Sequence, residues 1–472
     1  MCTCAISSSL SVQRNQSLAA NAHRRRLLAA GIATLFAPCT YANSVFVTNC
    51  NDSGPGSLRS AVSVAATSDF VNMLALTTAN PGCAASTITL TTGDIVVNQD
   101  DLNIAGPLDD TLTVSGQYTP PTGPPTVEHK RIFTHLGTGL LILQHMSISH
   151  GYVASAGNAS GGCIYSKGNV QLFAARVSDC SAISTNGFAY GGALFTTGRS
   201  SMYYANVTRN VVIDHGSGSA GGGAVWSTGG LSMRYSTVAG NSALCEAGKS
   251  NANFGGISSQ GGNAYILSST ISGNSACFAI GGLGVAYAGS TELVNSTIAN
   301  NEAKAGPIGG ASLNSGTVSI FNSTVAFNAA ATTGGSSPGL ALKATTVTLY
   351  SNLLSNNVYG AGIANDITIS SATVNGAKNL VFAPAASLPS GVIVGKCPLL
   401  GSLRDNGGLT ETIAIESHSP AIDVGNNVFS TPLSSDQRGS PFVRSSGAAP
   451  DIGAYEVDQT DIVFTAGFDG CP

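Results

Sequence analysis

Gly222-Gly223-Ala224-Val225 and, eleven residues after Val225, Ser236-Thr237-Val238-Ala239-Gly240-Asn241 form the stretch that decides the fold. The Gly-Gly pair with a following apolar residue begins at positions 161, 191, 222, 255, 281 and 309, and a degenerate copy, Pro-Gly, begins at 338. From the second glycine to the last residue of the second motif the distance is 18 residues in six copies and 19 in one. A distance held this constant through seven copies indicates a structural repeat.

The period of the repeat predicts its architecture. The second motif ends at positions 180, 210, 241, 274, 301, 328 and 357, which are 27 to 33 residues apart. Repeats of this length are typical of solenoids, propellers or arrays. Between the motifs apolar and polar residues alternate, as at Leu231/Met233 and Val318/Ile320, which predicts strands with one buried face. No helical period is present, and the longer blade and Trp-Asp signature of a propeller are missing, so we predict an all-β, single-stranded parallel β-helix.

One polar residue recurs at the same phase of each repeat. In a stack of rungs, an inward amide at one corner can bond the amides above and below it. We therefore predict a structural ladder with no chemical role, in which Cys180 replaces one member. The ladder residues are Asn210, Asn241, Asn274, Asn301, Asn328 and Asn357.

Composition limits the function classes. The chain has 472 residues, of which 9% are charged and 43% hydrophobic, and a net charge of −4. A typical globular protein carries roughly 25% charged residues. This balance argues against a nucleic-acid partner and leaves few groups for acid/base catalysis. The seven histidines are scattered and no Cys-x-x-Cys pair exists, so we expect neither a metal nor another cofactor.

The N-terminus predicts export. Arg24-Arg25-Arg26 precedes an apolar run at 27–37, and Thr40-Tyr41-Ala42 supplies a small-x-small cleavage site. We interpret residues 1–42 as a signal peptide and expect no transmembrane span in the mature chain.

Eight cysteines remain after the signal peptide, and an even number in an exported chain predicts disulfides. Cys245 and Cys277 lie four and three residues past their ladder positions in adjacent rungs, so stacking favours their pairing. Cys50–Cys83 is the other preferred pair, although eight cysteines leave the connectivity open.

The two ends differ from the repeats. Residues 43–85 are expected to be an N-terminal cap in which a helix at 57–65 buries one face, formed by Leu58, Ala61, Val62 and Ala65. The β-helix then occupies 86–395. Residues 396–457 are expected to be a C-terminal cap because 396–461 holds 13 charged residues in 66, against 13 in 196 over 162–357. A tail, 458–472, follows.

Several motifs resemble those of exported bacterial proteins. Asn49-Cys50-Asn51-Asp52-Ser53-Gly54-Pro55-Gly56-Ser57-Leu58-Arg59 is similar to the entry segment of right-handed parallel β-helix proteins of the pectin-lyase-like kind. The Gly-Gly repeats resemble those of polymorphic outer-membrane proteins. Asp405-Asn406-Gly407-Gly408-Leu409-Thr410, Ser419-Pro420-Ala421-Ile422-Asp423 and Asp451-Ile452-Gly453-Ala454-Tyr455-Glu456 resemble the choice-of-anchor Q region. The resemblance implies a right-handed solenoid, an extracellular or outer-membrane-associated location and an anchoring role, and no established enzymatic activity.

Candidate chemistry is confined to the C-terminal cap. Acidic residues within the rungs, such as Asp179 and Asp214, do not fall at the same phase. In the cap, five residues are candidates to converge: Asp423, Asp436, Arg438, Asp451 and Glu456. Salt bridges and turn bonds that close the last rung are the favoured interpretation, and a Ca²⁺ or sugar site is the alternative.

These patterns predict a monomeric, exported, non-enzymatic protein that serves in surface display or adhesion. Loops after the ladder residues vary in length, as in 242–254 against 275–280, and would present binding surfaces to a glycan or a cell-surface protein. The alternative is a polysaccharide lyase or glycoside hydrolase acting along the flank, and a third possibility is a passive envelope component.

Overall fold

The computed structural model describes residues 43–117, 128–216, 218–245, 253–331, 336–360, 362–429 and 432–458. The expected signal peptide and all but the first residue of the expected tail lie outside these ranges. None of the helices in the described part of the chain has the length and apolarity needed to cross a membrane.

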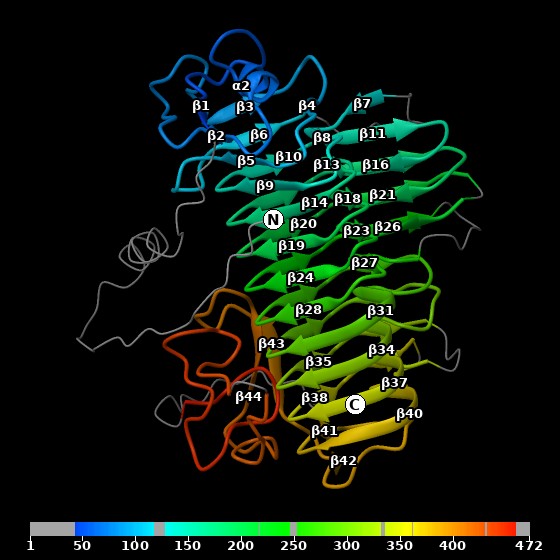
Figure 1. The fold of residues 1–472 in the computed structure, drawn as a ribbon. Helices are drawn as coiled ribbons and strands as arrows, with labels where there is room; N and C mark the ends of the chain where they lie inside the picture. The colour runs from blue at the N-terminus through cyan, green and yellow to red at the C-terminus, as the bar shows by residue number, and fades with distance from the viewer. Residues whose placement is uncertain are drawn as a thin grey trace. The chain divides into compact units, whose positions relative to one another are not determined.

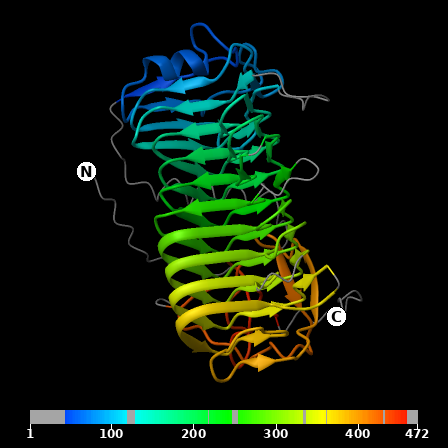
Figure 2. The ribbon, with the colours of Figure 1, turned by 90° about the vertical axis from the view of Figure 1, so that its right-hand side faces the viewer.

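The chain folds as a right-handed parallel β-helix, which confirms the predicted fold (Figures 1 and 2). Sheet A consists of β1 (Ser44–Phe46), β2 (Phe70–Asn72), β4 (Ile95–Val97), β5 (Leu102–Ala105), β8 (Phe133–His135), β9 (Leu140–Gln144), β13 (Ile164–Ser166), β14 (Asn169–Phe173), β18 (Leu194–Thr196), β19 (Ser200–Tyr203), β23 (Val225–Ser227), β24 (Leu231–Arg234), β27 (Ile257–Gln260), β28 (Ala264–Leu267), β31 (Leu283–Val294), β34 (Ala311–Phe321), β37 (Leu340–Tyr350) and β40 (Ile367–Ala377). Sheet B consists of β3 (Thr87–Thr89), β6 (Thr113–Ser115), β10 (Ser147–Ser149), β15 (Arg176–Ser178), β20 (Asn206–Thr208), β25 (Thr237–Ala239), β29 (Thr270–Ser272), β32 (Thr297–Ala299), β35 (Thr324–Ala326), β38 (Leu353–Ser355), β41 (Leu380–Val381) and β42 (Ile393–Val394).

Two smaller sheets complete the rungs. Sheet C consists of β7 (Glu128–Lys130), β11 (Tyr152–Ser155), β16 (Ser181–Ser184), β21 (Val211–Asp214), β26 (Ser242–Cys245), β30 (Ser275–Ala276), β33 (Glu302–Ala303), β36 (Ala329–Ala330) and β39 (Val358–Tyr359). Sheet D consists of β12 (Ala159–Ser160), β17 (Ala189–Tyr190) and β22 (Ala220–Gly221). A rung therefore runs through sheets A, B, C and D in turn, and each strand pairs in parallel with its equivalent in the next rung, except for the antiparallel β7.

The period-two pattern places the core inside the solenoid. Leu231, Met233, Val318 and Ile320 are all buried in one continuous apolar cluster, as their alternation with polar residues requires. This cluster extends from the N-terminal helix to the last rungs.

The Gly-Gly motif makes the corner between sheets D and A. Gly222, the first glycine of its pair, has φ of +64°, and a Cβ on it would lie 2.4 Å from the carbonyl oxygen of Val225. A Cβ on the second glycine, Gly223, would lie 2.2 Å from the carbonyl oxygen of Gly255 in the next rung. The first glycine is thus needed for the turn and the second for close stacking of rungs.

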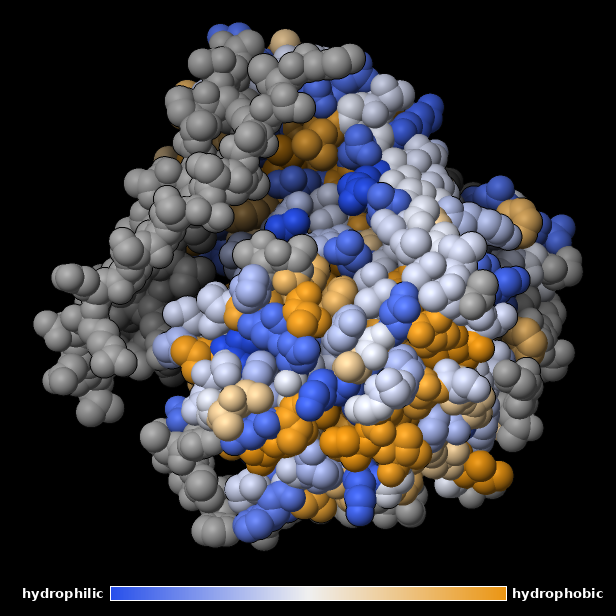
Figure 3. All heavy atoms as spheres, turned by 60° about the horizontal axis from the view of Figure 1, so that its bottom comes forward, coloured by the Kyte–Doolittle hydropathy of each residue, from blue (hydrophilic) through white to orange (hydrophobic). Residues whose placement is uncertain are grey.

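Both open ends of the core are covered. At the N-terminal end, α2 (Leu58–Val64) buries Leu58, Ala61 and Val62 against the core, and its N-cap Ser57 accepts a hydrogen bond from the Ser60 N–H. At the other end, Leu388 and Val392 pack against the core. Figure 3 views the molecule from that end and shows apolar and polar residues intermixed.

The C-terminal segment, residues 396–457, lies beside the rungs instead of closing the last one. It contains the antiparallel pair β43 (Leu400–Arg404) and β44 (Thr412–Ile415), drawn in orange beside the green and yellow rungs of Figure 1. Its residues hydrogen-bond to four successive rungs, at Thr270, Thr297, Thr324 and Ser351. This differs from the prediction of an end cap, because a stack with exposed outer sheet faces offers a long flank as well as an end.

Candidate binding surface on the solenoid flank

The expected ladder residues form a buried column between sheets B and C. The Asn241 Oδ1 accepts from both the backbone N–H and the Nδ2 of Asn210, at 3.0 and 2.9 Å, and the same pair of bonds links each later asparagine to the next. Each Nδ2 also donates to a carbonyl oxygen of sheet B. These amides are fully buried, and their N–H groups donate hydrogen bonds to the next asparagine and to the backbone, so they hold the rungs together.

The column ends in a carboxylate. Asp366 accepts from the N–H and Nδ2 of Asn357 on one oxygen and from the Ala383 N–H on the other, at 2.7 to 3.1 Å. The last side chain of such a column accepts hydrogen bonds from the asparagine before it, and no further amide follows to which it could donate one. An aspartate carboxylate, which only accepts, fits this position better than an asparagine. Burial raises the pKa of Asp366, since no cation offsets the loss of solvent.

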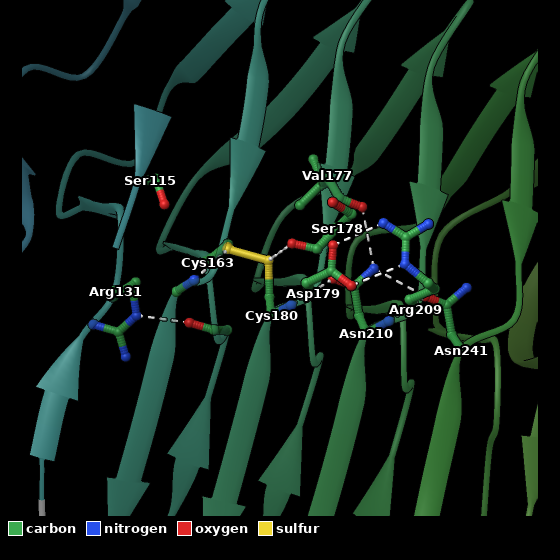
Figure 4. The surroundings of a disulfide bond; sticks show 12 residues. Ser115, Arg131, Cys163, Val177, Ser178, Asp179, Cys180, Arg209, Asn210 and Asn241 are labelled. Atoms are coloured by element: carbon green, nitrogen blue, oxygen red, sulfur yellow. Dashed lines mark hydrogen bonds and ion pairs between the residues drawn. A yellow bond between two sulfur atoms is a disulfide. The ribbon is translucent and has the colours of Figure 1, made fainter. Parts of the chain in front are cut away.

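Cys180, at the first ladder position, forms a disulfide with Cys163 of the same rung (Figure 4). Its N–H donates to the Asn210 Oδ1 at 3.0 Å, so the column begins here without an amide side chain. The sequence did not predict this pair, because Cys180 was interpreted only as a substitute for asparagine in the ladder. Cys50–Cys83 and Cys245–Cys277 are also present, and Cys397 is disulfide-bonded.

The five charged candidates of the C-terminal segment lie together, and their charges are already satisfied. Asp436 binds Arg438 at 2.7 Å, and the Arg438 guanidinium lies 3.9 Å from the ring centroids of both Phe442 and Tyr455. The Asp451 carboxylate accepts from the N–H groups of Asp423 and Val457. Asp423 in turn accepts from the Ala449 N–H at 3.4 Å.

Arg444, which the sequence analysis missed, binds Glu456 at 2.9 Å with both side chains at most 2% exposed. Burial raises the pKa of Glu456 to about 7, against the opposing effect of Arg444. Four of the five candidates are buried, and no cluster of His, Cys, Asp and Glu suited to a metal ion occurs within the described ranges. The four buried candidates are therefore bonded within the C-terminal segment, and Asp423 is the one of the five that is partly exposed.

The Ser-Thr pair of the repeat has two structural roles, one of which involves the C-terminal segment. The serines form a buried ladder at the corner between sheets A and B, as when the Ser236 N–H donates to Ser269 and the Ser269 N–H to Ser296. The threonines point outward from sheet B, and Thr270 and Thr297 donate to Glu411 O and Gln437 Oε1, both at 2.6 Å. Hence one residue of the pair aligns the rungs and the other attaches the C-terminal segment.

The outer side of this A/B corner divides into two halves. In the covered corner the successive residues are Ser268, Asn295, Asn322 and Ser351, all buried beneath the C-terminal segment. Ser268 O accepts from Thr410 Oγ1, and Asn295 bonds Ser435 O and Arg444.

The open corner, in the rungs before Ser268 and along the strand β28 that leads into Ser268, is lined by aromatic side chains instead. Its residues are His145, Phe173, Tyr203, Tyr204, Arg234, Tyr235 and Tyr265, all partly exposed. Phe173 lies edge-on to His145 and to Tyr204, with centroids 5.6 and 5.9 Å apart, and Tyr204 stacks on Tyr235 at 5.3 Å and 6°. In-register rungs, about 4.8 Å apart, bring these rings into one row.

The open corner also holds polar groups that the protein does not use. Among the described contacts, none of the four tyrosine hydroxyls makes a hydrogen bond, and the Arg234 Nε is buried without a partner. Arg234 lies over the rings of Tyr265 and Tyr203, at 4.8 and 5.9 Å from their centroids. Aromatic faces beside unspent donors are the features of a surface that recognises a polar ligand.

A second aromatic row fills the corner between sheets D and A, next to the loops of variable length. Tyr190 stacks on Trp226 at 3.9 Å, and Phe254 lies edge-on to Trp226 at 5.9 Å. Two polar side chains here have partners within the protein, since Tyr190 bonds Ser219, and Arg131 bonds the Gly161 carbonyl and pairs with Asp94. Phe254 also occupies the space over Gly284, where a Cβ would lie 2.3 Å from its ring. This row is therefore packing, and the open A/B corner is the stronger candidate.

Neither a family model, nor a curated protein, nor a solved structure matches the chain. The candidate surface consequently stands on its own geometry. The sequence signal for it was partial, since Tyr204 and Tyr235 recur one repeat apart, whereas Phe173 lies one residue before that phase.

Proposed function

We propose that this is an exported, non-enzymatic β-helix protein that acts in surface display or adhesion by binding a glycan along its flank. The observation that carries the proposal is the open corner, where a row of aromatic faces and unspent donors is fixed on a rigid stack. The apolar faces of sugar rings stack on aromatic side chains, and their hydroxyls require donors and acceptors. The disulfides and the expected signal peptide support export.

Binding of the purified protein to a glycan array, to immobilised polysaccharides and to cells tests the proposal. The variant Tyr204→Ala/Tyr235→Ala removes the stacked pair. We expect the affinity for the glycan to fall by at least about tenfold, since each stacking contact contributes roughly 1 kcal/mol. Tyr287→Ala is the matched control, because Tyr287 is 82% exposed and lies outside the row.

Two outcomes would overturn the proposal. One is that no glycan or cell binds, or that the double variant and the control bind equally well. The other is release of reducing or unsaturated ends from the polysaccharides, which would favour the polysaccharide-active enzyme instead.

A further inference from the structure

Arg234 is held in a way that sets it apart from the ion-paired arginines of the fold. Arg59, Arg131, Arg209, Arg438 and Arg444 each pair with a carboxylate at 2.7 to 3.6 Å. Arg234 makes neither an ion pair nor a side-chain hydrogen bond in the described part of the chain, although its Nε is buried. The Arg234 side chain as a whole is partly exposed, so a ligand would reach its exposed atoms and not the buried Nε.

The tyrosines keep the guanidinium in place while leaving its hydrogen-bonding edge unspent. Tyr203 lies beside Arg234 in the preceding rung and Leu267 beside it in the following one, and neither accepts a hydrogen bond from Arg234 in the described contacts. Tyr265 lies under the guanidinium group, at 4.8 Å. A cation over an aromatic face is attracted by the ring, which offsets part of the missing ion pair.

Around the corner, two arginines without a carboxylate partner in the described contacts, Arg234 and Arg176, outnumber one carboxylate of the same kind, Glu292. Arg176 is exposed at the start of β15, on the sheet B side of the corner, and it has no carboxylate partner among the described contacts. On the same flank Asp179 is ion-paired with Arg209, and Asp110 lies 2.9 Å from His145 Nδ1, a contact that is an ion pair only when the imidazole is protonated. Glu292 is opposite Tyr265 in the next rung and forms no ion pair with Arg234.

From these contacts we infer that the open corner binds a saccharide that carries a carboxylate or sulfate group, with its ring on Tyr204 and Tyr235 and its anionic group on Arg234. This inference rests on the proposed function and adds the charge of the ligand. Arg234 recognises such a group well, because the planar guanidinium can donate two parallel hydrogen bonds to its oxygens.

A matched pair of ligands tests the inference. Acidic glycans that bind are compared with their neutral forms, such as polygalacturonate with its methyl ester, or a sulfated glycan with its desulfated form. We expect the acidic form to bind on the order of tenfold more tightly and to lose that advantage as salt rises. Arg234→Gln should abolish the preference, Arg234→Lys should retain part of it, and Lys343→Gln, which removes an exposed charge in β37, should leave it unchanged.

Failure of the inference and failure of the proposed function give different results. If neutral and acidic forms bind equally and Arg234→Gln matches the unaltered protein, the anionic ligand is wrong while glycan binding stands. If Tyr204→Ala/Tyr235→Ala also leaves every binding signal unchanged, the open corner is not the site at all.

Discussion

The covered and open halves of the A/B corner share one backbone and differ in almost every outward side chain. Where the C-terminal segment lies, the corner is built from small polar residues, of which Ser268 and Asn295 bond to that segment while the buried Asn322 Oδ1 has no partner in the described contacts. Where it does not lie, the equivalent positions hold Tyr204 and Tyr235, which stack and keep free hydroxyls. Small polar residues thus mark a surface used inside the protein, and aromatic residues mark one that is left for something else.

The largest loss of stability in the covered half is expected when the C-terminal segment loses its buried ion pair. Arg444→Met leaves Glu456 buried without its cation, and we expect a loss of about 3–5 kcal/mol in the free energy of unfolding. Denaturant unfolding measures the loss, and limited proteolysis should show cleavage within residues 396–457 first.

Arg209→Met is the control for that prediction. Its ion pair with Asp179 is on the surface, where the Arg209 side chain is 65% exposed, so we expect a loss below about 1 kcal/mol. Equal losses in the two variants would mean that the segment does not depend on the buried pair.

Raising the pH offers a second way to weaken the covered half. Burial raises the pKa of Glu456 from 4.5 to about 7, so the folded state favours the protonated carboxyl more than the unfolded state does. This contribution is complete below pH 4.5 and is lost as the pH rises through 7, with a loss on the order of 3 kcal/mol by pH 8. The raised pKa values of Asp366 and Asp451 act in the same direction.

Thermal unfolding between pH 5 and pH 8 checks this dependence. Glu456→Gln cannot titrate and should flatten the curve, whereas Glu302→Gln, at an exposed position in sheet C, should leave it as it was. A midpoint that rises with pH in the unaltered protein would contradict the prediction.

The ladder of amides could be predicted from the sequence because one residue type recurs at one phase, and a regular stack turns equal phase into contact. The attachment of the C-terminal segment could not be predicted in the same way. Thr270, Thr297 and Thr324 recur just as regularly as the asparagines, but their partners Glu411, Gln437 and Ala454 lie in a segment without a repeat. The open corner was still harder to predict from the sequence, because its aromatic row mixes His, Phe and Tyr and is present in only some of the rungs.

A pair of threonine substitutions sharpens the comparison between covered and open rungs. Thr297→Val removes the donor to Gln437 Oε1 in a buried contact, which should cost about 1–2 kcal/mol. Thr237→Val changes the equivalent residue in an uncovered rung, where the hydroxyl makes no bond in the described structure, and should stay within about 0.5 kcal/mol. Equal costs, measured by denaturant unfolding, would show that these threonines act through strand stability alone.

The smallest effect on stability is expected from giving the open corner the residue of the covered one. Tyr235→Ser copies Ser268 of the next rung and removes one ring of the stacked pair, which should cost about 1 kcal/mol, because the ring is partly exposed and supports no buried polar group. Denaturant unfolding should therefore show little change while glycan binding falls about fivefold. A large loss of stability would instead identify Tyr235 as part of the packing, as Trp226 is in the other corner, and would remove the distinction between the two halves.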